Sequence, residues 1–456
     1  MATNTISSPP HISRIKAFMD SPRMMKNPIQ IFKEYSDELG GTYAFHFGGI
    51  QEAYVTTEPE VIQHVLKTNY ENYNKSDIQT TRMKHFLGNG LLTSHGKFWT
   101  AQRRMIQQGF HREQLAIILD IMRDVLDDAL DNLEVKMKEG PVDIYHEMMR
   151  TTFKMATRSL FSTDLSKDEL ETIGNGISTI QGFLVKQISQ PYLNPWFSIS
   201  GAVKKHDEIR AESDAIIFKH VKRRRVEKGE RNDLLQILLD SYYGDTGEPM
   251  TDEQVLNETM QLLVAGHETS SNAVSWTMYL LSKHPEVVKK LNAEIESVLG
   301  DAPLQFADLP KLEYTSAVLN EAMRLYPPFW MVDRVAVNDD KIGDLEIKAG
   351  TQIIVFIYGV HHAAKYWENP EEFNPERFSK ENSKKIQPFS HIPFGGGPRG
   401  CIGGNYAMMQ MQLILTTILR RYNFEIPGRD DIEMRPMLIL RPKDGIKLKF
   451  TKLAAN

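Results

Sequence analysis

The segment Phe394–Gly403 constrains the fold of this chain more than any other part of its sequence. It reads Phe-Gly-Gly-Gly-Pro-Arg-Gly-Cys-Ile-Gly and contains Cys401, the only cysteine among 456 residues. Its glycines let the backbone turn sharply and approach a large, flat group. An apolar run compatible with a helix begins at Tyr406. We therefore expect Cys401 at or near a helix N-terminus, where amide N–H groups and the helix dipole stabilise a thiolate.

A lone cysteine cannot form an intrachain disulfide, so Cys401 needs another explanation. Arg399 places a fixed cation two residues before the sulfur. A thiolate in a glycine-rich turn, with an arginine for an anionic group, suits a metal-bound cofactor that carries carboxylates, and haem is one such cofactor. The alternative interpretation is a buried, inert cysteine that follows a glycine turn.

This segment resembles the haem-binding loop of the cytochromes P450, Phe-x-x-Gly-x-Arg-x-Cys-x-Gly. Its fixed positions are filled by Phe394, Gly397, Arg399, Cys401 and Gly403. The resemblance implies that Cys401 is the axial ligand of the iron of haem b, and that Phe394, Arg399 and Gly403 help to bind the cofactor. It also implies the P450 fold, which is mainly α, with a large helical domain and a smaller β-rich region.

The composition bounds the class of protein. The net charge of −5 gives no support for nucleic-acid binding. Disulfide-free cysteine usage suits a reducing cytoplasm. The apolar stretch 353–360 is too short to span a bilayer, and residues 1–10 lack the features of a secretory signal. We therefore expect a cytoplasmic monomer of the soluble, bacterial P450 type, without a membrane anchor.

The pattern of apolar residues predicts a mainly helical chain with strands toward both ends. A single P450 domain is expected over residues 1–456. The helical core is expected at about 99–330 and 401–422, and the β-rich parts at about 35–70, 335–360 and 435–450. Residues 351–357 are predicted to form a strand. The tail 438–450 is predicted to be a hairpin around Asp444-Gly445.

A long helix is predicted to begin at Thr251, and its middle carries a second motif, Ala265-Gly-His-Glu-Thr-Ser270. Taken alone, it is a helix with a weak point, since glycine costs about 1 kcal/mol relative to alanine there. The stretch matches the oxygen-activation motif of the P450 family. The resemblance implies a helix that distorts beside the iron, with Ala265 at the cofactor and Thr269 and Glu268 as catalytic residues. Thr269 would bond to dioxygen, and Glu268 would lie on the proton path.

A third motif, Glu321-Ala-Met-Arg324, matches the family's Glu-x-x-Arg pattern, and Pro375-Glu-Arg-Phe378 follows it. An ion pair three residues apart is common on any helix. The resemblance implies more, namely a buried network of Glu321, Arg324 and Arg377. Its role would be to fix the core behind the cysteine loop.

The carboxylates of a haem need cationic or hydrogen-bonding partners. Trp99 and Arg103 match the family's Trp-x-x-x-Arg motif, Arg334 follows a Pro-Pro pair, and His391 precedes Phe394 by three residues. The implied candidates are Arg399, Arg103, Arg334, His391, Trp99 and His95. For either histidine, a satisfied core residue is the alternative.

The resemblance implies a haem-thiolate monooxygenase that uses dioxygen to hydroxylate, or to dealkylate oxidatively (for example by O-demethylation), a small organic substrate. Because the chain ends near the predicted hairpin, electrons from NAD(P)H are expected through a separate ferredoxin or flavodoxin with its reductase. The alternative is a haem-binding sensor or carrier without turnover, but the Glu268–Thr269 pair favours an enzyme. The bulky run 329–332 is expected in the substrate pocket, and the basic run 222–225 is expected to be a solvated helix end.

Overall fold

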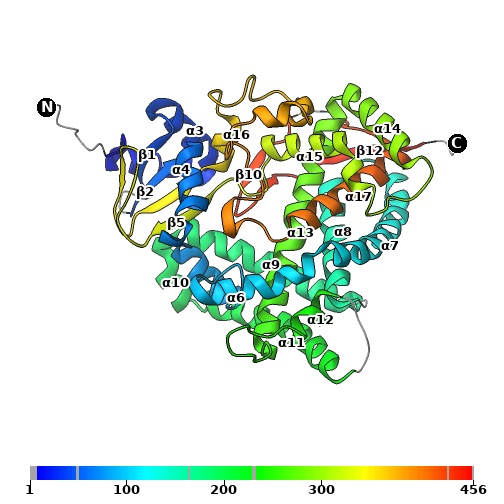
Figure 1. Ribbon diagram of the computed structural model, residues 1–456, viewed down its shortest axis with the longest axis horizontal. Helices are drawn as coiled ribbons and strands as arrows, with labels where there is room; N and C mark the ends of the chain where they lie inside the picture. Colours follow the sequence, from blue (N-terminus) through cyan, green and yellow to red (C-terminus); the bar gives the residue numbers. More distant parts are fainter. Residues whose placement is uncertain (1–7, 48–50, 163–164, 228–232, 429–430, 454–456) are drawn as a thin grey trace. The chain divides into compact units, whose positions relative to one another are not determined.

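The computed structural model describes residues 8–47, 51–162, 165–227, 233–428 and 431–453 (Figure 1). Most of the N-terminal segment considered above, residues 1–7, lies outside these ranges. The chain divides into two compact units, and each is built from three separate stretches. The sheet-rich unit comprises Met1–Ser76, Asn320–Cys401 and Met434–Arg441, and the helical unit comprises Asp77–Leu319, Ile402–Glu433 and Pro442–Asn456.

The main sheet of the sheet-rich unit has the strand order β1-β2-β8-β5-β3. Its strands are β1 (Thr42–Phe47), β2 (Gln51–Thr56), β3 (Tyr73–Asn74), β5 (Val332–Ala336) and β8 (Gln352–Val355). β2 and β8 are parallel, and the other neighbouring pairs are antiparallel. Figure 1 shows the blue N-terminal strands beside the yellow ones. A separate antiparallel pair is formed by β6 (Asp340–Ile342) and β7 (Leu345–Ile347).

The helices of this unit are α1 (Arg14–Met19), α2 (Ser21–Lys26), α3 (Pro28–Leu39), α4 (Pro59–Gln63) and α16 (Ile357–His362). The sheet has apolar layers on both faces because side chains alternate along β8. Ile354 packs with Phe32 of α3 in one core cluster, whereas Ile353 and Val355 pack with Val61 of α4 in another. Burying each such side chain stabilises the fold by about 1.5–3 kcal/mol.

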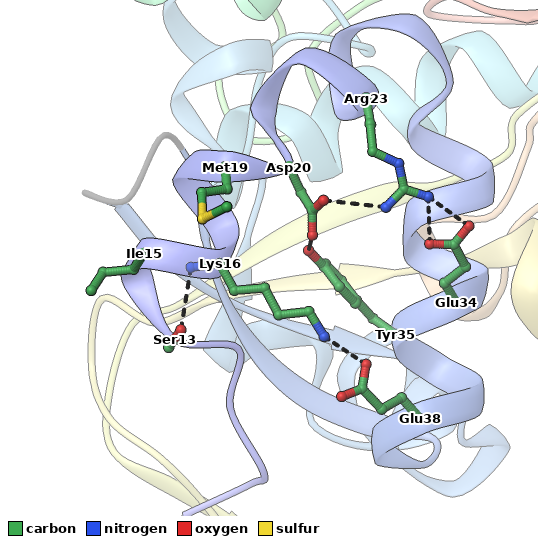
Figure 2. A pocket seen from close by; sticks show the side chains of 9 residues that line it. All are labelled: Ser13, Ile15, Lys16, Met19, Asp20, Arg23, Glu34, Tyr35 and Glu38. Atoms are coloured by element: carbon green, nitrogen blue, oxygen red, sulfur yellow. Dashed lines mark hydrogen bonds and ion pairs between the residues drawn. The ribbon is translucent and has the colours of Figure 1, made fainter.

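Ion pairs on the surface link α1 and α2 to α3 (Figure 2). Lys16 pairs with Glu38 at 2.7 Å, and Arg23 pairs with Glu34 at 2.7 Å. These side chains surround a surface cavity of about 430 Å³. Since the charged groups that line the cavity pair with one another, the cavity is better explained as a gap between the linked helices than as a binding site.

The helical unit is built around a long helix, α13. Its helices are α5 (Lys84–Leu87), α6 (Gly96–Gln107), α7 (Arg112–Met137), α8 (Ile144–Phe161), α9 (Lys167–Ser189), α10 (Asn194–Ile199), α11 (Ala202–Val226), α12 (Leu234–Leu239), α13 (Asp252–Lys283), α14 (Pro285–Leu299) and α17 (Gly404–Arg421). α13 packs against α8, α11 and α17. As predicted, Thr251 caps it: the Thr251 Oγ1 accepts the backbone N–H of Gln254 at 3.2 Å. Among the described helices, none combines the length and apolar character needed to cross a membrane.

The remaining elements are α15 (Glu313–Leu325), which runs through the unit boundary, and five strands. The strands are β4 (Val142–Asp143), β9 (Tyr422–Glu425), β10 (Met434–Pro436), β11 (Leu440–Pro442) and β12 (Lys447–Lys452). The mainly α architecture with small sheets confirms the predicted fold class.

The predicted hairpin over residues 438–450 is wrong. β11 pairs with β10, whereas β12 pairs with β4 and β9, so the two halves of the tail belong to different sheets. The chain does turn at Gly445, but there it docks on Asp143, whose Oδ1 accepts the backbone N–H of Ile446 at 3.1 Å. A local turn signal cannot reveal strand partners that lie far away in the sequence.

Two further expectations need correction. The strand predicted over 351–357 ends at Val355, and the same apolar run continues as α16, because periodicity alone does not separate a short strand from a buried helix. The basic run 222–225 is only partly solvated. Arg224 is buried and donates to Asp233 at 2.7 and 2.9 Å, and Arg225 donates to Asp252 at 2.9 Å.

Candidate active site

The cysteine loop turns tightly before α17. The backbone N–H of Cys401 donates to the carbonyl of Phe394 at 2.8 Å, and that of Gly400 donates to the carbonyl of Gly397 at 3.0 Å. Gly397 has a φ of +66°, and a Cβ there would lie 2.0 Å from the carbonyl oxygen of Leu66. Only glycine fits this position. Cys401 itself is exposed, which contradicts its interpretation as a buried, inert side chain.

The cysteine loop contains one arginine, Arg399, and a second, Arg334, lies close to it in the sheet-rich unit. The Nη1 of Arg399 donates to the carbonyl of Tyr70 at 2.9 Å and to that of Tyr73, and its guanidinium lies 5.3 Å from the centre of the Tyr70 ring. Arg334, on β5, is only 8% exposed, and its Nη1 donates to the carbonyl of Asp333 at 2.6 Å.

The buried guanidinium of Arg334 and the partly buried guanidinium of Arg399 form a cationic site. Burial and the positive charge of Arg399 lower the pKa of Arg334 to about 10, and burial also lowers the pKa of Arg399. Positive charge that is desolvated and adjacent to more positive charge is stabilised by an anion. A carboxylate-bearing cofactor therefore fits beside the cysteine loop, and haem propionates have that chemistry.

His391 packs into the protein interior. Its ring lies 4.5 Å from that of Phe378 and 5.2 Å from that of His361, and its Nε2 donates to the carbonyl of Asn320 at 3.3 Å. Burial and the charge of Arg324 lower the pKa of His391 to about 3, so the ring is neutral. With Nε2 as its only donor, this placement favours a role in the core over the contact with a propionate expected from the sequence.

Glu321, Arg324 and Arg377 are brought together, with Glu321 and Arg324 completely buried. Arg324 makes two bonds to the Glu321 carboxylate, at 2.7 and 2.8 Å, and the Nε of Arg377 donates to it at 3.3 Å. Arg324 also donates to the carbonyls of His361 and Pro370. The carboxylate and its cations are thus satisfied by a dense set of partners.

α13 is buried along most of its length except for one stripe at its middle. Ala265 is exposed, and Leu262, Gly266 and Thr269 are partly exposed, at the spacing of one helical face. The hydroxyl of Thr269 donates to the carbonyl of Ala265 at 3.0 Å. Glu268 is completely buried. α13 is continuous from Asp252 to Lys283, and the distortion expected beside the iron stays a prediction.

The remaining sequence candidates lie around α6. Trp99 is buried and Arg103 is partly exposed, four residues apart on one face of this helix. His95 is the N-terminal capping residue of α6 rather than part of its first turn, and its side chain is exposed. Arg104, the next residue after Arg103, is exposed.

Trp330, which is expected from the sequence in the substrate pocket, lies elsewhere. Trp330 is buried in the core of the sheet-rich unit, where its Nε1 donates to the carbonyl of Met437 at 2.8 Å. Sequence reasoning also missed the residues that support the cysteine loop, because the loop rests on backbone carbonyls of Leu66, Tyr70 and Tyr73. A carbonyl carries no signature of residue type, so no motif could have found them.

The candidate site residues are divided between the two units. The sheet-rich unit holds Cys401, Arg399, Arg334, His391, Phe394 and the Glu321 network, and the helical unit holds Trp99, Arg103, His95, Ala265, Glu268, Thr269 and Gly403. Across the described ranges, no three His, Cys, Asp or Glu side chains are grouped to hold a metal ion.

Comparison with known proteins identifies the family. A family model described as Cytochrome P450 matches residues 9–450. Cyclooctat-9-en-7-ol 5-monooxygenase of Streptomyces melanosporofaciens is 31% identical over 83% of this chain and 82% of its own length. Protein LUTEIN DEFICIENT 5, chloroplastic, of Arabidopsis thaliana is 29% identical over 91% of this chain and 72% of its own. Cytochrome P450 4V2 of Homo sapiens is 28% identical over 86% and 79%, respectively.

Proposed function

This chain belongs to the cytochrome P450 family, and from that premise we propose that Cys401 is the axial ligand of haem b in a dioxygen-dependent monooxygenase. The family makes the chain an oxidoreductase that uses haem, dioxygen and electrons from a redox partner. The single observation that carries the assignment of the ligand is the exposed Cys401 in a glycine turn next to the cationic site formed by the buried Arg334 and the partly buried Arg399.

The residues of the loop suit a haem. Cys401 would supply a thiolate, and Arg399 and Arg334 would neutralise propionates. When bound, the haem supplies the oxidising power that breaks a C–H bond. The family resemblance assigns further cofactor contacts to Trp99, Arg103, His95, Phe394, Gly403 and Ala265, and also to His391, for which the geometry described above favours a role in the core.

We assign the control of protons to α13. Thr269 is one of its few accessible residues, and its hydroxyl, which donates to the carbonyl of Ala265, would be the group that passes on protons during dioxygen activation. Glu268 precedes it and is completely buried, so its carboxyl group is shielded from bulk water. A shielded acid beside an accessible alcohol is suited to deliver protons one at a time.

The substrate is expected to be largely apolar. The accessible stripe of α13 consists of Leu262, Ala265 and Gly266, with Thr269 as its one hydroxyl. The Streptomyces relative is named for oxidising carbon 5 of cyclooctat-9-en-7-ol, which is an unsaturated alcohol. Hydroxylation of such a molecule, or O-demethylation of a methyl ether by hydroxylation of its methyl carbon, fits this surface.

An acidic electron carrier is proposed as the redox partner, namely a ferredoxin or flavodoxin with an NAD(P)H-dependent reductase. Lys67 is exposed, and its Cα lies against Gly397, where Gly397 and Pro398 are also exposed. A cation beside the cysteine loop would attract an acidic protein, and salt would weaken that attraction.

The proposed function is tested with labelled oxygen. Candidate substrates are first screened by the shift of the Soret band on binding, and the best is incubated with a ferredoxin, its reductase and ¹⁸O₂. A monooxygenase places one labelled atom in the hydroxylated product. NAD(P)H consumption without any labelled product from a substrate that shifts the Soret band would contradict the proposal.

A further inference from the structure

Asp340 lies behind the cysteine loop at the start of β6, outside every motif discussed above. We propose that Asp340 is a positioning residue that holds the cysteine loop in place through residues 64–73, here called the support segment. The inference deepens the proposed function and rests on it, because it takes Cys401 as the ligand. Asp340, the support segment and residues 394–401 of the cysteine loop belong to the sheet-rich unit.

A single carboxylate oxygen of Asp340 gathers three side chains of the support segment. Its Oδ2 accepts from the hydroxyl of Tyr73 at 2.7 Å, from the Nε2 of His64 at 2.8 Å and from the Nδ2 of Asn69 at 2.9 Å. The Oδ1 accepts the backbone N–H of Lys341 at 2.8 Å, which fixes the carboxylate on its own strand. Asp340 thus clamps both ends of the segment.

The support segment in turn carries the cysteine loop. The carbonyl of Leu66 meets Gly397 so closely that no Cβ fits between them, and the carbonyls of Tyr70 and Tyr73 accept from Arg399. Tyr73 takes part in both layers, since its hydroxyl reaches Asp340 and its carbonyl reaches Arg399. Any displacement of this segment therefore moves the loop that carries Cys401.

The backbone of the support segment has little regular structure to hold it. It consists of the π-helical turn η1 (His64–Thr68), Asn69, the 3-10 turn η2 (Tyr70–Asn72) and Tyr73, the first residue of the two-residue strand β3, which pairs with β5. Such short, irregular pieces make few hydrogen bonds of their own and open at low cost. The pairing of β3 with β5 and the bonds between Asn72 and Asn338 hold the C-terminal end of the segment, and Asp340 adds an anchor that also holds His64 and Asn69.

The anchor is charged and partly shielded. Although burial raises it, the hydrogen bonds from Tyr73, His64 and Asn69 bring the pKa of Asp340 down to about 2. Hydrogen bonds to an ionised acceptor are about twice as strong as neutral ones. Conversion to asparagine removes that charge and turns one acceptor atom into a donor, so the three donors of the segment compete for one neutral oxygen.

The test compares Asp340→Asn and Tyr73→Phe with the control Asp339→Asn in the haem-loaded protein. Asp339 is the adjacent aspartate, and its carboxylate binds Lys348 and the backbone N–H of Ala349 instead of the support segment. Deuterium exchange is followed in peptides that cover residues 64–73 and 394–403. Urea titrations follow the long-wavelength Soret band of the reduced CO complex together with the far-UV circular dichroism.

For Asp340→Asn we expect exchange about 10-fold faster in both peptides, and for Tyr73→Phe a smaller increase in both. The long-wavelength band of Asp340→Asn should be lost at urea concentrations that leave the circular dichroism intact, whereas Asp339→Asn should match the parent. Exchange of 394–403 that stays within twofold of the parent would overturn the proposal, as would loss of the band only together with the circular dichroism.

This design separates the two claims. A parent protein that binds haem but shows no long-wavelength band would overturn the assignment of Cys401. The exchange of residues 394–403 in Asp340→Asn would then still decide whether Asp340 holds the loop.

Discussion

Glu321 and Arg324 form a two-point ion pair at 2.7 and 2.8 Å in which both side chains are completely buried. The pair is joined by Arg377 at 3.3 Å. Because the charges cannot be solvated by water, each depends on the others, and the network is strong only while it is complete.

Glu321→Gln should therefore destabilise the protein by about 3–5 kcal/mol, because it leaves buried arginines without their counter-charge. Urea unfolding measures the loss, and haem occupancy after purification should fall with it. The matched control is Glu313→Gln, an exposed glutamate on the same helix, for which a change within about 0.5 kcal/mol is expected. Equal stability of the two variants would contradict the dependence on a complete network.

Gly397→Ala tests the close contact between the cysteine loop and Leu66. The new Cβ would lie 2.0 Å from a carbonyl oxygen, at a backbone φ of +66°, so a loss of at least about 1–3 kcal/mol is expected. The control is Gly182→Ala on α9, where nothing lies within 4 Å of the new Cβ and where about 1 kcal/mol of stabilisation is expected from helix propensity. Thermal unfolding distinguishes these opposite signs, and an unchanged Gly397→Ala variant would contradict the described loop.

Thr269→Ala should uncouple electron flow from oxidation of the substrate. Without the hydroxyl, proton delivery becomes disordered, so product formation should fall by at least about tenfold while peroxide per NAD(P)H rises. The control is Thr277→Ala at a buried position on the same helix. It removes a similar hydrogen bond, which the Thr277 hydroxyl donates to the carbonyl of Ala273 at 2.7 Å. Equal coupling in Thr269→Ala and the parent would remove Thr269 from the proton path.

The stability of the folded protein should depend on pH through the protonation of His391. Its pKa is about 3 in the folded protein and about 6.5 in an unfolded chain. The unfolded state therefore binds more protons between these values, so stability is full above pH 6.5 and is lost as the pH falls. Between pH 7 and pH 5 the loss from this residue is about 2 kcal/mol. In urea titrations His391→Gln should flatten that part of the curve, and an equally steep curve would contradict a ring that stays neutral in the folded protein.

The predictions from sequence succeeded where residue type and local period carry the information. The 32-residue helix α13 has a capped start and a long apolar pattern, and the loop around Cys401 needs glycines at fixed places. They failed where the partner is distant or consists of backbone. β12 pairs with β4 and β9, which lie far away in the sequence. Arg224 belongs to a run that looks solvated, but it forms a buried ion pair with Asp233. Arg399 donates to the backbone carbonyls of Tyr70 and Tyr73.

The reduced CO spectrum of Cys401→Ala tests the central claim most directly. With Cys401 as the thiolate ligand, the parent shows the long-wavelength Soret band and the variant loses it, even when haem is retained. A variant that binds haem and keeps this band unchanged would contradict the assignment of Cys401 as the ligand of the iron.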